Sequence, residues 1–381
     1  MYHIFNVYAR VKYCILINLS VIMIFTRVIF CDKILCGEKI MFGYIKTDYD
    51  KKVYETELKD FLPDNIVDAH AHIWRVQDDE FDRSKFPQKW TNRVAGECPI
   101  EDLLQTYKDF FPGKKVVPVV FGNSVKRCAQ HNAYVKSVKE NYGFPTMYWT
   151  TYDMTPEFLE EEVIKGGFSG LKPYLGGCRQ GVKPSDANIL DFLPHKHLEV
   201  ADKLGLNVIL HISKNDRLKN KDNVKELLEI EQKYPNVKLT VAHIGRAYAN
   251  EDLGTALDEL KNTKNMTFDF SANTNGDVIR RCIETVGVKR VLFGTDLPIA
   301  KMRMKRVVEN GVYINVIPKG IYGDVSNDIH MREVEDDREI SNFTYEIVRG
   351  FMKASSDLNL SRADVEDIMC NNACKLYGIK F

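Results

Sequence analysis

Four short apolar stretches of the chain end in side chains that bind metal ions or transfer protons. NIVDAHAHI carries His70 and His72, NVILHIS carries His211, VKLTVAHIG carries His243, and RVLFGTDLP carries Asp296. Residues i and i+2 of a β-strand point to the same face, so His70 and His72 can chelate one ion. Three imidazoles with a carboxylate suit a divalent cation, with zinc favoured over manganese, cobalt or iron. A lone histidine here is more often a packed core residue, but the set together predicts a metal centre.

A second His-x-His pattern, His195 and His197, follows Pro194 in a stretch with helical periodicity. Residues i and i+2 of a helix diverge by about 200° around its axis, so these two imidazoles cannot share an ion. We therefore expect this pair to lie on a solvated helix surface.

The elements that must position these side chains recur along the chain. Eight apolar runs are candidate strands, at 65–73, 114–122, 145–153, 168–175, 207–213, 237–245, 266–272 and 290–298. Amphipathic stretches with helical spacing, such as 188–205 and 223–235, separate them. Nearly continuous apolar runs suit parallel strands that are buried on both faces. This α/β pattern predicts a (β/α)8 TIM barrel, with a doubly wound open sheet as the alternative, although no GxGxxG follows the first run.

Active sites of such barrels form at the carboxyl ends of the strands, which is where the four histidines and the aspartate fall. Asp68 precedes His70 by two residues. It can face the same side and brace a ligand, or it can cap the bottom of the strand, and we leave it out of the predicted site.

The composition of the chain indicates which kinds of binding partner to expect. The 381 residues are 44% hydrophobic and 28% charged, with 53 Lys and Arg against 53 Asp and Glu. Zero net charge without a long basic block argues against nucleic acid or an anionic membrane as the main partner, and it favours a small-molecule substrate. Nine cysteines without a CxxC pair favour reduced thiols in a cytoplasmic protein.

Residues 1–40 differ from the rest of the chain. Their apolar stretch CILINLSVIMIFT is shorter than the about 20 residues of a spanning helix, and no small-residue cleavage site follows it. Three interpretations stay open: an over-long gene model with the true start at Met41, an N-terminal membrane anchor, or a signal peptide. We expect residues 41–381 to form a single barrel domain that includes the C-terminal helices.

The motifs VDAHAHIW, LKPY, ILHIS, VAHIGR and FGTDLP, in this order, resemble the amidohydrolase superfamily of metal-dependent TIM-barrel hydrolases. Within it, the chain resembles the amidohydrolase-related branch that contains aminocarboxymuconate semialdehyde decarboxylase and several lactonases. The resemblance covers roughly residues 60–380, including the tail DIMCNNACKLYGI, which looks like the C-terminal helix of that branch.

The resemblance implies roles for individual residues. His70, His72, His211 and Asp296 would bind one divalent metal, and His243 would either support these ligands or be catalytic. A bound ion lowers the pKa of its water to about 7. Asp296 would accept the proton of that water and pass it to the leaving group, while His243 polarises the attacked carbonyl.

Further residues are candidates for contact with substrate. Lys172 lies where dinuclear members of the superfamily carry a carboxylated lysine that bridges two ions, and it can instead face a substrate carboxylate or serve the barrel structurally. Arg246 would hold a substrate carboxylate through its planar guanidinium, or form a loop salt bridge. Other candidate lining residues, just beyond strand ends, are Tyr174, Trp74, Arg75, Asn273 and Arg179.

Two long excursions leave the expected catalytic end of the barrel. Residues 301–341 are longer than an ordinary connection, and we expect part of them to form a lid. Residues 74–102 follow the first run, and their two tryptophans and Phe81 either pack over substrate or pack on the surface.

These features favour a hydrolase that acts on a C–O or C–N bond of a small organic acid, lactone or amide. The alternative is a metal-dependent, non-oxidative decarboxylase of a small unsaturated or aromatic acid. A third reading, from another class, is a non-catalytic barrel that binds a metal or ligand. Barrels of this kind often pair, so a homodimer is also open.

Overall fold

The computed structural model describes residues 39–41, 44–78, 90–123 and 127–381. The described residues divide into two units, one that ends at Asp48 and one that begins at Tyr49. In the first unit, β1 (Lys39–Met41) pairs antiparallel with β2 (Tyr44–Lys46). The three interpretations of residues 1–40 concern mainly residues 1–38, which lie outside the described residues, and they stay predictions. Within the described ranges, no helix combines the length and apolar character needed to cross a membrane.

Eight parallel strands form the framework of the second unit, and each lies within one of the predicted runs. They are β3 (Asn65–His72), β4 (Lys115–Phe121), β5 (Met147–Thr150), β6 (Gly170–Pro173), β7 (Asn207–Leu210), β8 (Lys238–Val241), β9 (Met266–Asp269) and β10 (Val291–Leu292). Strands β5 to β10 pair in chain order as one six-stranded sheet, and β3 pairs with β4.

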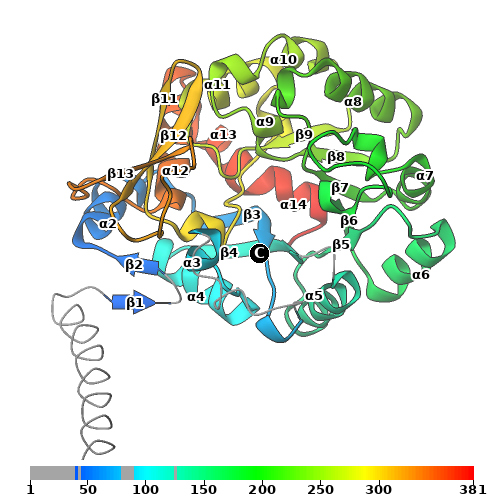
Figure 1. Ribbon diagram of the computed structural model, residues 1–381, viewed down its shortest axis with the longest axis horizontal. Helices are drawn as coiled ribbons and strands as arrows, with labels where there is room; N and C mark the ends of the chain where they lie inside the picture. Colours follow the sequence, from blue (N-terminus) through cyan, green and yellow to red (C-terminus); the bar gives the residue numbers. More distant parts are fainter. Residues whose placement is uncertain (1–38, 42–43, 79–89, 124–126) are drawn as a thin grey trace, which may run out of the picture. The chain divides into compact units, whose positions relative to one another are not determined.

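Backbone contacts join these two sheets on both sides. Val120 of β4 forms a parallel bridge with Thr146, just ahead of β5, and Ala71 of β3 forms one with Leu297, beyond β10. The amide of Ala69 also donates to the carbonyl of Phe293 at 3.0 Å. The strands therefore follow one another around a (β/α)8 TIM barrel (Figure 1), as predicted, rather than across an open doubly wound sheet.

The strands end before the apolar runs do. Every residue of β5, β6 and β7 is buried, as expected for strands covered on both faces. His70 and His72 belong to β3, whereas His211, His243 and Asp296 lie in the segments that leave β7, β8 and β10. All five positions are therefore at the carboxyl end of the barrel.

Helices follow the strands around the outside of the barrel (Figure 1). The α-helices are α2 (Asp48–Val53), α3 (Trp90–Val94), α4 (Ile100–Phe110), α5 (Cys128–Tyr142), α6 (Pro156–Gly166), α7 (His195–Leu204), α8 (Lys221–Lys233), α10 (Ala256–Leu260), α11 (Gly276–Val286), α12 (Phe343–Asp357), α13 (Arg362–Glu366) and α14 (Asn372–Tyr377). The segment labelled α9 (His243–Arg246) is a single left-handed turn, because all four of its residues have positive φ. Single turns complete the set: the π-helical η1 (Tyr54–Leu58) and η10 (Asp367–Asn371), and the 3₁₀ turns η2 (Val76–Asp78), η4 (Leu175–Gly177), η5 (Ile189–Asp191), η6 (Arg217–Lys219), η7 (Asn250–Asp252), η8 (Val288–Arg290) and η9 (Ile299–Lys301). Side-chain caps fix several starts, among them Thr155 for α6, Asn220 for α8 and Asn275 for α11.

Helix α7 corrects two expectations. It begins only at His195, because Pro194 occupies its N-cap and the preceding residues form the separate turn η5. His197 is fully buried, and its Nε2 donates to the carbonyl of Met154 at 2.9 Å, whereas His195 is partly exposed. The prediction of two solvated imidazoles is wrong for His197, because positions i and i+2 diverge and only one of them can face solvent.

The C-terminal tail is helical and packs on the barrel. The carbonyl of Ile368 accepts a hydrogen bond from the amide of Phe293 at 3.0 Å, and Asn372 Nδ2 donates to the carbonyl of Val291 at 3.0 Å. Cys370 and Ala373 belong to the same buried cluster as core residues of the barrel strands. The six cysteines in the described part of the chain are free thiols.

The excursion at 301–341 forms a small second sheet. Strand β11 (Lys305–Glu309) pairs antiparallel with β12 (Val312–Pro318), which pairs in parallel with β13 (Met331–Val334). The segment is therefore an ordered accessory element of the barrel.

Candidate metal centre

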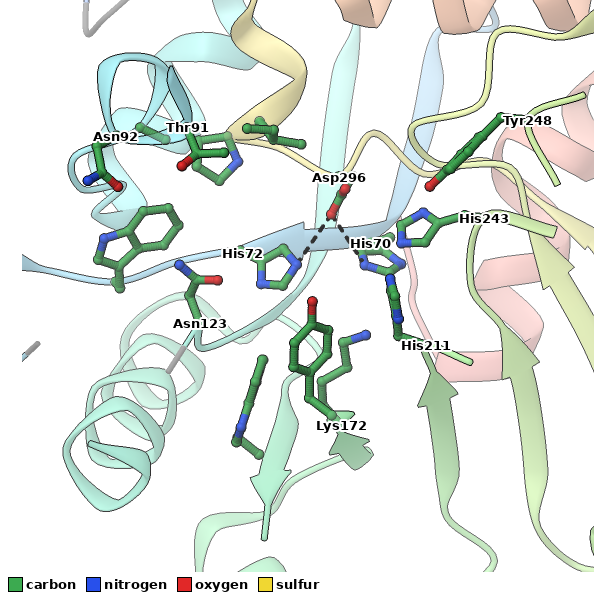
Figure 2. A pocket seen from close by; sticks show the side chains of 16 residues that line it. His70, His72, Thr91, Asn92, Asn123, Lys172, His211, His243, Tyr248 and Asp296 are labelled. Carbon is green, nitrogen blue, oxygen red and sulfur yellow. Dashed lines mark ion pairs between the residues drawn. The ribbon is translucent and has the colours of Figure 1, made fainter. Parts of the chain in front are cut away.

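A cavity of about 350 Å³ opens at the carboxyl end of the barrel (Figure 2). It is lined by His70, His72, Trp74, Thr91, Asn92, Ala95, Asn123, Trp149, Lys172, Tyr174, His211, His243, Tyr248, Asp296, Pro298 and Ile299. All residues predicted to bind metal or to be catalytic therefore share one cavity. Polar groups gather at its centre, and aromatic rings form part of its wall.

Two histidines of β3 converge on one carboxylate. Nε2 of His72 lies 3.3 Å from Oδ1 of Asp296, and Nε2 of His70 lies 3.5 Å from the same oxygen. The ligand atoms of these three residues lie within 4.8 Å of one another. Figure 2 shows the two imidazoles on either side of the Asp296 carboxylate.

The Nδ1 atoms of the same two rings form hydrogen bonds on the side away from Asp296. Nδ1 of His72 lies 3.0 Å from the carbonyl oxygen of Gly122, and Nδ1 of His70 lies 3.0 Å from Oδ2 of Asp269. Because a carbonyl oxygen and an ionised carboxylate only accept hydrogen bonds, both Nδ1 atoms donate. Both rings are therefore Nδ1–H tautomers. Their Nε2 lone pairs face Asp296 and are free to bind a metal.

His211 and His243 lie beside this group. Their ring centroids are 5.4 Å apart, and Nδ1 of His243 donates to the carbonyl of Ser271 at 2.9 Å. Nδ1 of His211 is buried and has no hydrogen-bond partner among the described residues, a rare state for a buried polar atom. Burial lowers the pKa of His211 far below its usual range and lowers that of His243 to about 4. Both imidazoles are therefore neutral at pH 7, the form that binds metals.

Asp296 supplies the negative charge of the centre. Burial alone would raise its pKa, but the neighbouring His243 and the side chain of His72 hold that pKa down to about 2. The backbone of Asp296 has a φ of 66°, in the left-handed region that few non-glycine residues adopt. Its amide donates to the carbonyl of His70 at 2.9 Å, so the turn that aims the carboxylate is tied to β3.

Asp269, at the end of β9, is a residue of the site that the sequence analysis missed. Its carboxylate is fully buried. It accepts hydrogen bonds from Nδ1 of His70, from the amide of His243 at 2.9 Å, and from the hydroxyl and amide of Ser271. Burial opposes ionisation, but the interactions with His70 and His243 lower the pKa of Asp269 far below its usual range. A carboxylate in the middle of the apolar run MTFDFSA was a signal that could have identified it.

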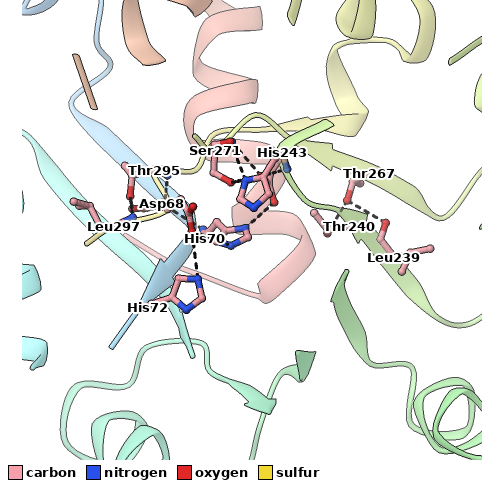
Figure 3. Close-up of polar contacts among 12 residues, drawn as sticks. Asp68, His70, His72, Leu239, Thr240, His243, Thr267, Ser271, Thr295 and Leu297 are labelled. Carbon is pink, nitrogen blue, oxygen red and sulfur yellow. Dashed lines mark hydrogen bonds and ion pairs between the residues drawn. The ribbon is translucent and has the colours of Figure 1, made fainter. Parts of the chain in front are cut away.

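Asp68 takes the bracing role that was left open (Figure 3). It is fully buried and accepts hydrogen bonds from the amide of His70 at 3.1 Å, the amide of Thr295 at 2.9 Å, the Thr295 hydroxyl and the hydroxyl of Tyr107 at 2.7 Å. Burial raises the pKa of Asp68 to about 6. It thus links the strand of the two histidines to the segment that carries Asp296.

Lys172 and Tyr174 both line the cavity, as predicted. Lys172 is 1% exposed, and its Nζ lies 4.9 Å from the ring centroid of Phe121. In the part of the chain that the structure describes, no carboxylate pairs with it. Burial lowers the pKa of Lys172 to about 8. The amine therefore remains largely cationic at pH 7 and can attract an anionic group.

Four other sequence candidates do not line the cavity. Nη1 of Arg246 donates to the carbonyls of Ser213 and Lys214, which fix the turn after β8. Arg75 pairs with Asp78, Arg179 pairs with Asp191, and Asn273 donates to the carbonyl of Ala247. The predicted contact of Arg246 with a substrate carboxylate stays a prediction.

The excursions contribute unequally to the cavity wall. Trp74, Thr91, Asn92 and Ala95 place part of the 74–102 excursion over the site, while Phe81 lies outside the described residues. Among the described residues, none from 301–341 lines the cavity, so the expected lid is wrong for this conformation. The segment pairs with itself as a sheet instead of lying over the opening. Asn92, Asn123 and Tyr248 were missed, because no motif marks a residue that only long-range packing brings to the site.

The donor set fits a divalent metal. Neutral imidazole nitrogens and an ionised carboxylate converge, one buried imidazole nitrogen lacks a partner, and Asp269 and Gly122 orient the rings from behind. His70, His243 and Asp269 form a second cluster, but the oxygens of Asp269 already accept several hydrogen bonds. We therefore assign Asp269 to orientation of the imidazoles.

Comparisons with known proteins identify the family of the chain and its fold. A family model described as Amidohydrolase matches residues 67–379. An amidohydrolase structure from Burkholderia multivorans with bound zinc has a TM-score of 0.53 at 11% identity, over 83% of this chain and 99% of that one. A putative 2-pyrone-4,6-dicarboxylic acid hydrolase from Pseudomonas putida has a TM-score of 0.51 at 15% identity, over 84% and 100% of the two chains.

A dihydroxybenzoic acid decarboxylase from Polaromonas sp. JS666, with bound manganese and 2-nitroresorcinol, has a TM-score of 0.51 at 13% identity, over 83% of this chain and 97% of that one. At such identities, likeness to a solved structure shows the fold alone. A search of curated protein sequences found no match to the chain.

Proposed function

The chain belongs to the amidohydrolase family of enzymes, and from this premise we propose that it is a metal-dependent hydrolase acting on a C–O or C–N bond of a small organic acid, lactone or amide. One observation carries the proposal: Nε2 atoms of two β3 histidines lie 3.3 and 3.5 Å from one oxygen of Asp296, inside a cavity that His211 and His243 also line.

We assign one ion to His70, His72, His211 and Asp296. A divalent ion in such a site supplies a Lewis acid and a water whose pKa is about 7. Asp296 is ionised at neutral pH and can take the proton of a water nucleophile and return it to the leaving group. His243, whose Nδ1 donates to the carbonyl of Ser271, leaves an unprotonated Nε2 that can accept a hydrogen bond from the water nucleophile and orient it.

Zinc and manganese are the ions to test first, because both occur in structures of similar fold. Lys172 would bind an anionic substrate group rather than bridge two ions. Lys172 has no carboxylate partner among the described residues and stays largely cationic at pH 7, and both features support this role.

The first experiment measures the metal content of the full-length protein and of a His70→Ala/His72→Ala variant by plasma mass spectrometry. We expect about one equivalent in the wild type and little in the variant. His195→Ala, at a partly exposed helix position, is the control and should retain the metal. Two equivalents would reassign Lys172 to a bridging role, and no metal in the wild type after growth with zinc and manganese would refute the proposal.

A decarboxylase is the second candidate, because the unpaired Lys172 can also hold the carboxylate that such an enzyme removes. Product analysis separates the two reactions. A hydrolase yields a ring-opened acid or a free amine from lactones and amides, whereas a decarboxylase releases carbon dioxide from unsaturated or aromatic acids. The protein would be a non-catalytic binding protein if it binds metal but converts neither the lactones and amides nor the acids. In that case His243→Asn should change neither its ligand affinity nor any activity.

The predicted partners, location and oligomeric state of the protein stay proposals. A small molecule is the proposed partner, with no nucleic acid and no specific membrane partner. A cytoplasmic location and a homodimer remain predictions from the cysteine usage and the fold class.

A further inference from the structure

We propose that Tyr248 is a catalytic residue whose hydroxyl donates a hydrogen bond to the acyl oxygen of the substrate, and that the sheet β11–β13 exists to hold it there. The inference rests on the proposed function and deepens it, since it adds a substrate contact to the same site.

Tyr248 is placed to touch substrate. It lines the cavity together with His243 and Asp296, and Figure 2 shows its hydroxyl end turned toward these two residues. Its ring is packed, yet its hydroxyl has no hydrogen-bond partner in the described part of the chain. Tyr248 is half-buried and its hydroxyl faces the open cavity, so the hydroxyl is free to donate to a group bound there. The partner in this case would be the substrate.

The backbone of Tyr248 is fixed on both sides. Oδ2 of Asp252 accepts hydrogen bonds from the amide of Tyr248 at 3.0 Å and from the amide of Ala249 at 2.9 Å. Nδ2 of Asn275, the residue that caps α11, donates to the carbonyl of Tyr248 at 3.1 Å. The loop that follows β8 therefore holds one conformation without help from a ligand.

The aromatic ring is clamped by the accessory sheet. The Cζ atom of Arg306, on β11, lies 4.7 Å from the ring centroid of Tyr248 and 4.7 Å from that of Tyr313, on β12. The two tyrosine rings meet edge to face at 5.0 Å. Such cation–π and aromatic contacts restrict the ring to one orientation.

Arg306 is itself fixed. Its Nε donates to Oδ1 of Asn315 at 2.9 Å, and its Nη1 donates to the carbonyl of Ala272 at 2.6 Å. Asn315 contacts Sδ of Met331 at 3.6 Å, so all three strands of the sheet support the clamp. This gives the 301–341 excursion a role that does not require a lid: it positions a cavity residue from behind.

The chemistry needs a donor at this place. When a water nucleophile adds to an acyl carbon, the C=O π pair moves to the oxygen, which becomes negative while the new C–O bond forms. The hydroxyl of Tyr248 stabilises that charge by hydrogen bonding and keeps its own proton, so no bond of the tyrosine breaks. A donor that is fixed beforehand contributes most, because it does not reorganise during the reaction.

The test compares Tyr248→Phe with the wild type, each loaded with metal, on the best substrate of the hydrolysis panel. We expect kcat to fall about 100-fold with a much smaller change in KM, as for loss of one oxyanion donor. Metal content and thermal midpoint should not change. Tyr142→Phe, which removes an exposed hydroxyl bound to Glu101, is the matched control and should keep full activity. A kcat within about twofold of wild type for Tyr248→Phe would overturn the proposal.

Arg306 is a positioning residue, and its test is a double-mutant cycle. Arg306→Lys should lower kcat about tenfold in the wild-type background and hardly at all in the Tyr248→Phe background, because it acts through that hydroxyl. Equal effects in both backgrounds would refute the clamp.

A second readout separates this inference from the proposed function. Methylphosphonate mimics the tetrahedral anion, and its affinity for metal-loaded protein can be measured by calorimetry without turnover. We expect the dissociation constant to rise about tenfold in Tyr248→Phe, consistent with one lost hydrogen bond to a charged group. If the wild type hydrolyses nothing but shows this difference, the proposed function fails and Tyr248 remains an anion contact. Equal affinities would overturn the inference alone, and a metal-loaded wild type that neither binds methylphosphonate nor turns over substrate would overturn both.

Discussion

An aspartate serves a metal centre either by binding the ion or by fixing the histidines that bind it, and this site contains both kinds. The oxygens of Asp269 accept donors from His70, His243 and Ser271, while Asp296 faces only the Nε2 side of the two β3 imidazoles. Both carboxylates have lowered pKa values, so charge alone does not distinguish them. The contacts distinguish them, because the oxygens of Asp269 are used as hydrogen-bond acceptors and Asp296 faces the nitrogens that can bind a metal.

Asp269→Asn should weaken metal binding without removing a ligand. An amide in place of the carboxylate loses the charged partner of His70 Nδ1, and such losses cost about 10- to 100-fold in metal affinity. Competition against a chromogenic chelator measures the change. Asp277→Asn, at an exposed aspartate paired with Lys353, is the control. An affinity as high as that of the control would show that Asp269 does not support the centre.

Asp68→Ala should destabilise the fold itself. The change leaves buried donors of His70, Thr295 and Tyr107 without an acceptor, which should cost about 3 kcal/mol in the free energy of unfolding. Asp64→Ala is the comparison, since the Asp64 side chain is 93% exposed and forms only a surface pair with Lys114. Urea unfolding of both variants gives the difference, and equal midpoints would contradict the bracing role.

At the scale of elements, sequence periodicity located the strands but not what lies beyond them. The eight apolar runs contain the eight strands because burial on both faces requires a continuous apolar pattern, which is visible locally. Four histidines and Asp296 were found because polar residues interrupt that pattern at its carboxyl end. Asp269 was overlooked although it interrupts a run in the same way, since no second signal accompanied it.

Residues that arrive by long-range packing left no local signal. Tyr248 depends on Arg306 and Tyr313, which lie more than fifty residues away in the chain. The 301–341 segment was interpreted as a lid from its length and point of departure, but pairing between its strands, which composition does not reveal, makes it a sheet. Helix α7 shows the same limit, because helical spacing separates His195 from His197 without saying which one faces the core.

His197→Ala and His195→Ala form a matched pair that tests this assignment on α7. Loss of the buried His197 ring removes packing and leaves the carbonyl of Met154 without its donor, so we expect a destabilisation of about 2–3 kcal/mol. His195→Ala removes a partly exposed side chain and should cost below about 1 kcal/mol. Denaturant unfolding measures both, and metal content should be unchanged in each. A larger loss for His195→Ala would reverse the assignment.

At the scale of the whole molecule, the proposed metal would link the two sheets of the barrel. His70 and His72 lie on β3, His211 follows β7, and Asp296 follows β10, so the ligands belong to both the two-stranded and the six-stranded sheet. Three backbone hydrogen bonds link β3 to the segment after β10 in the described chain, and they join Ala69 to Phe293, His72 to Leu297 and Asp296 to His70. A bound ion would therefore add a further link across this junction.

Removal of the metal should consequently destabilise the entire barrel and not only the cavity. A ligand that binds the native state alone stabilises it by RT ln(1 + [L]/Kd), or about 2.7 kcal/mol at a free metal concentration of 100 Kd. Treatment with EDTA should thus lower the thermal midpoint of the wild type, and added zinc or manganese should restore it. The His70→Ala/His72→Ala variant should melt at the same temperature with and without EDTA, because it has no ion to lose. If chelation removes the metal and leaves the wild-type midpoint unchanged, the ion does not bind the native state in preference to the unfolded chain, and the barrel junction is closed by its backbone contacts and by Asp68.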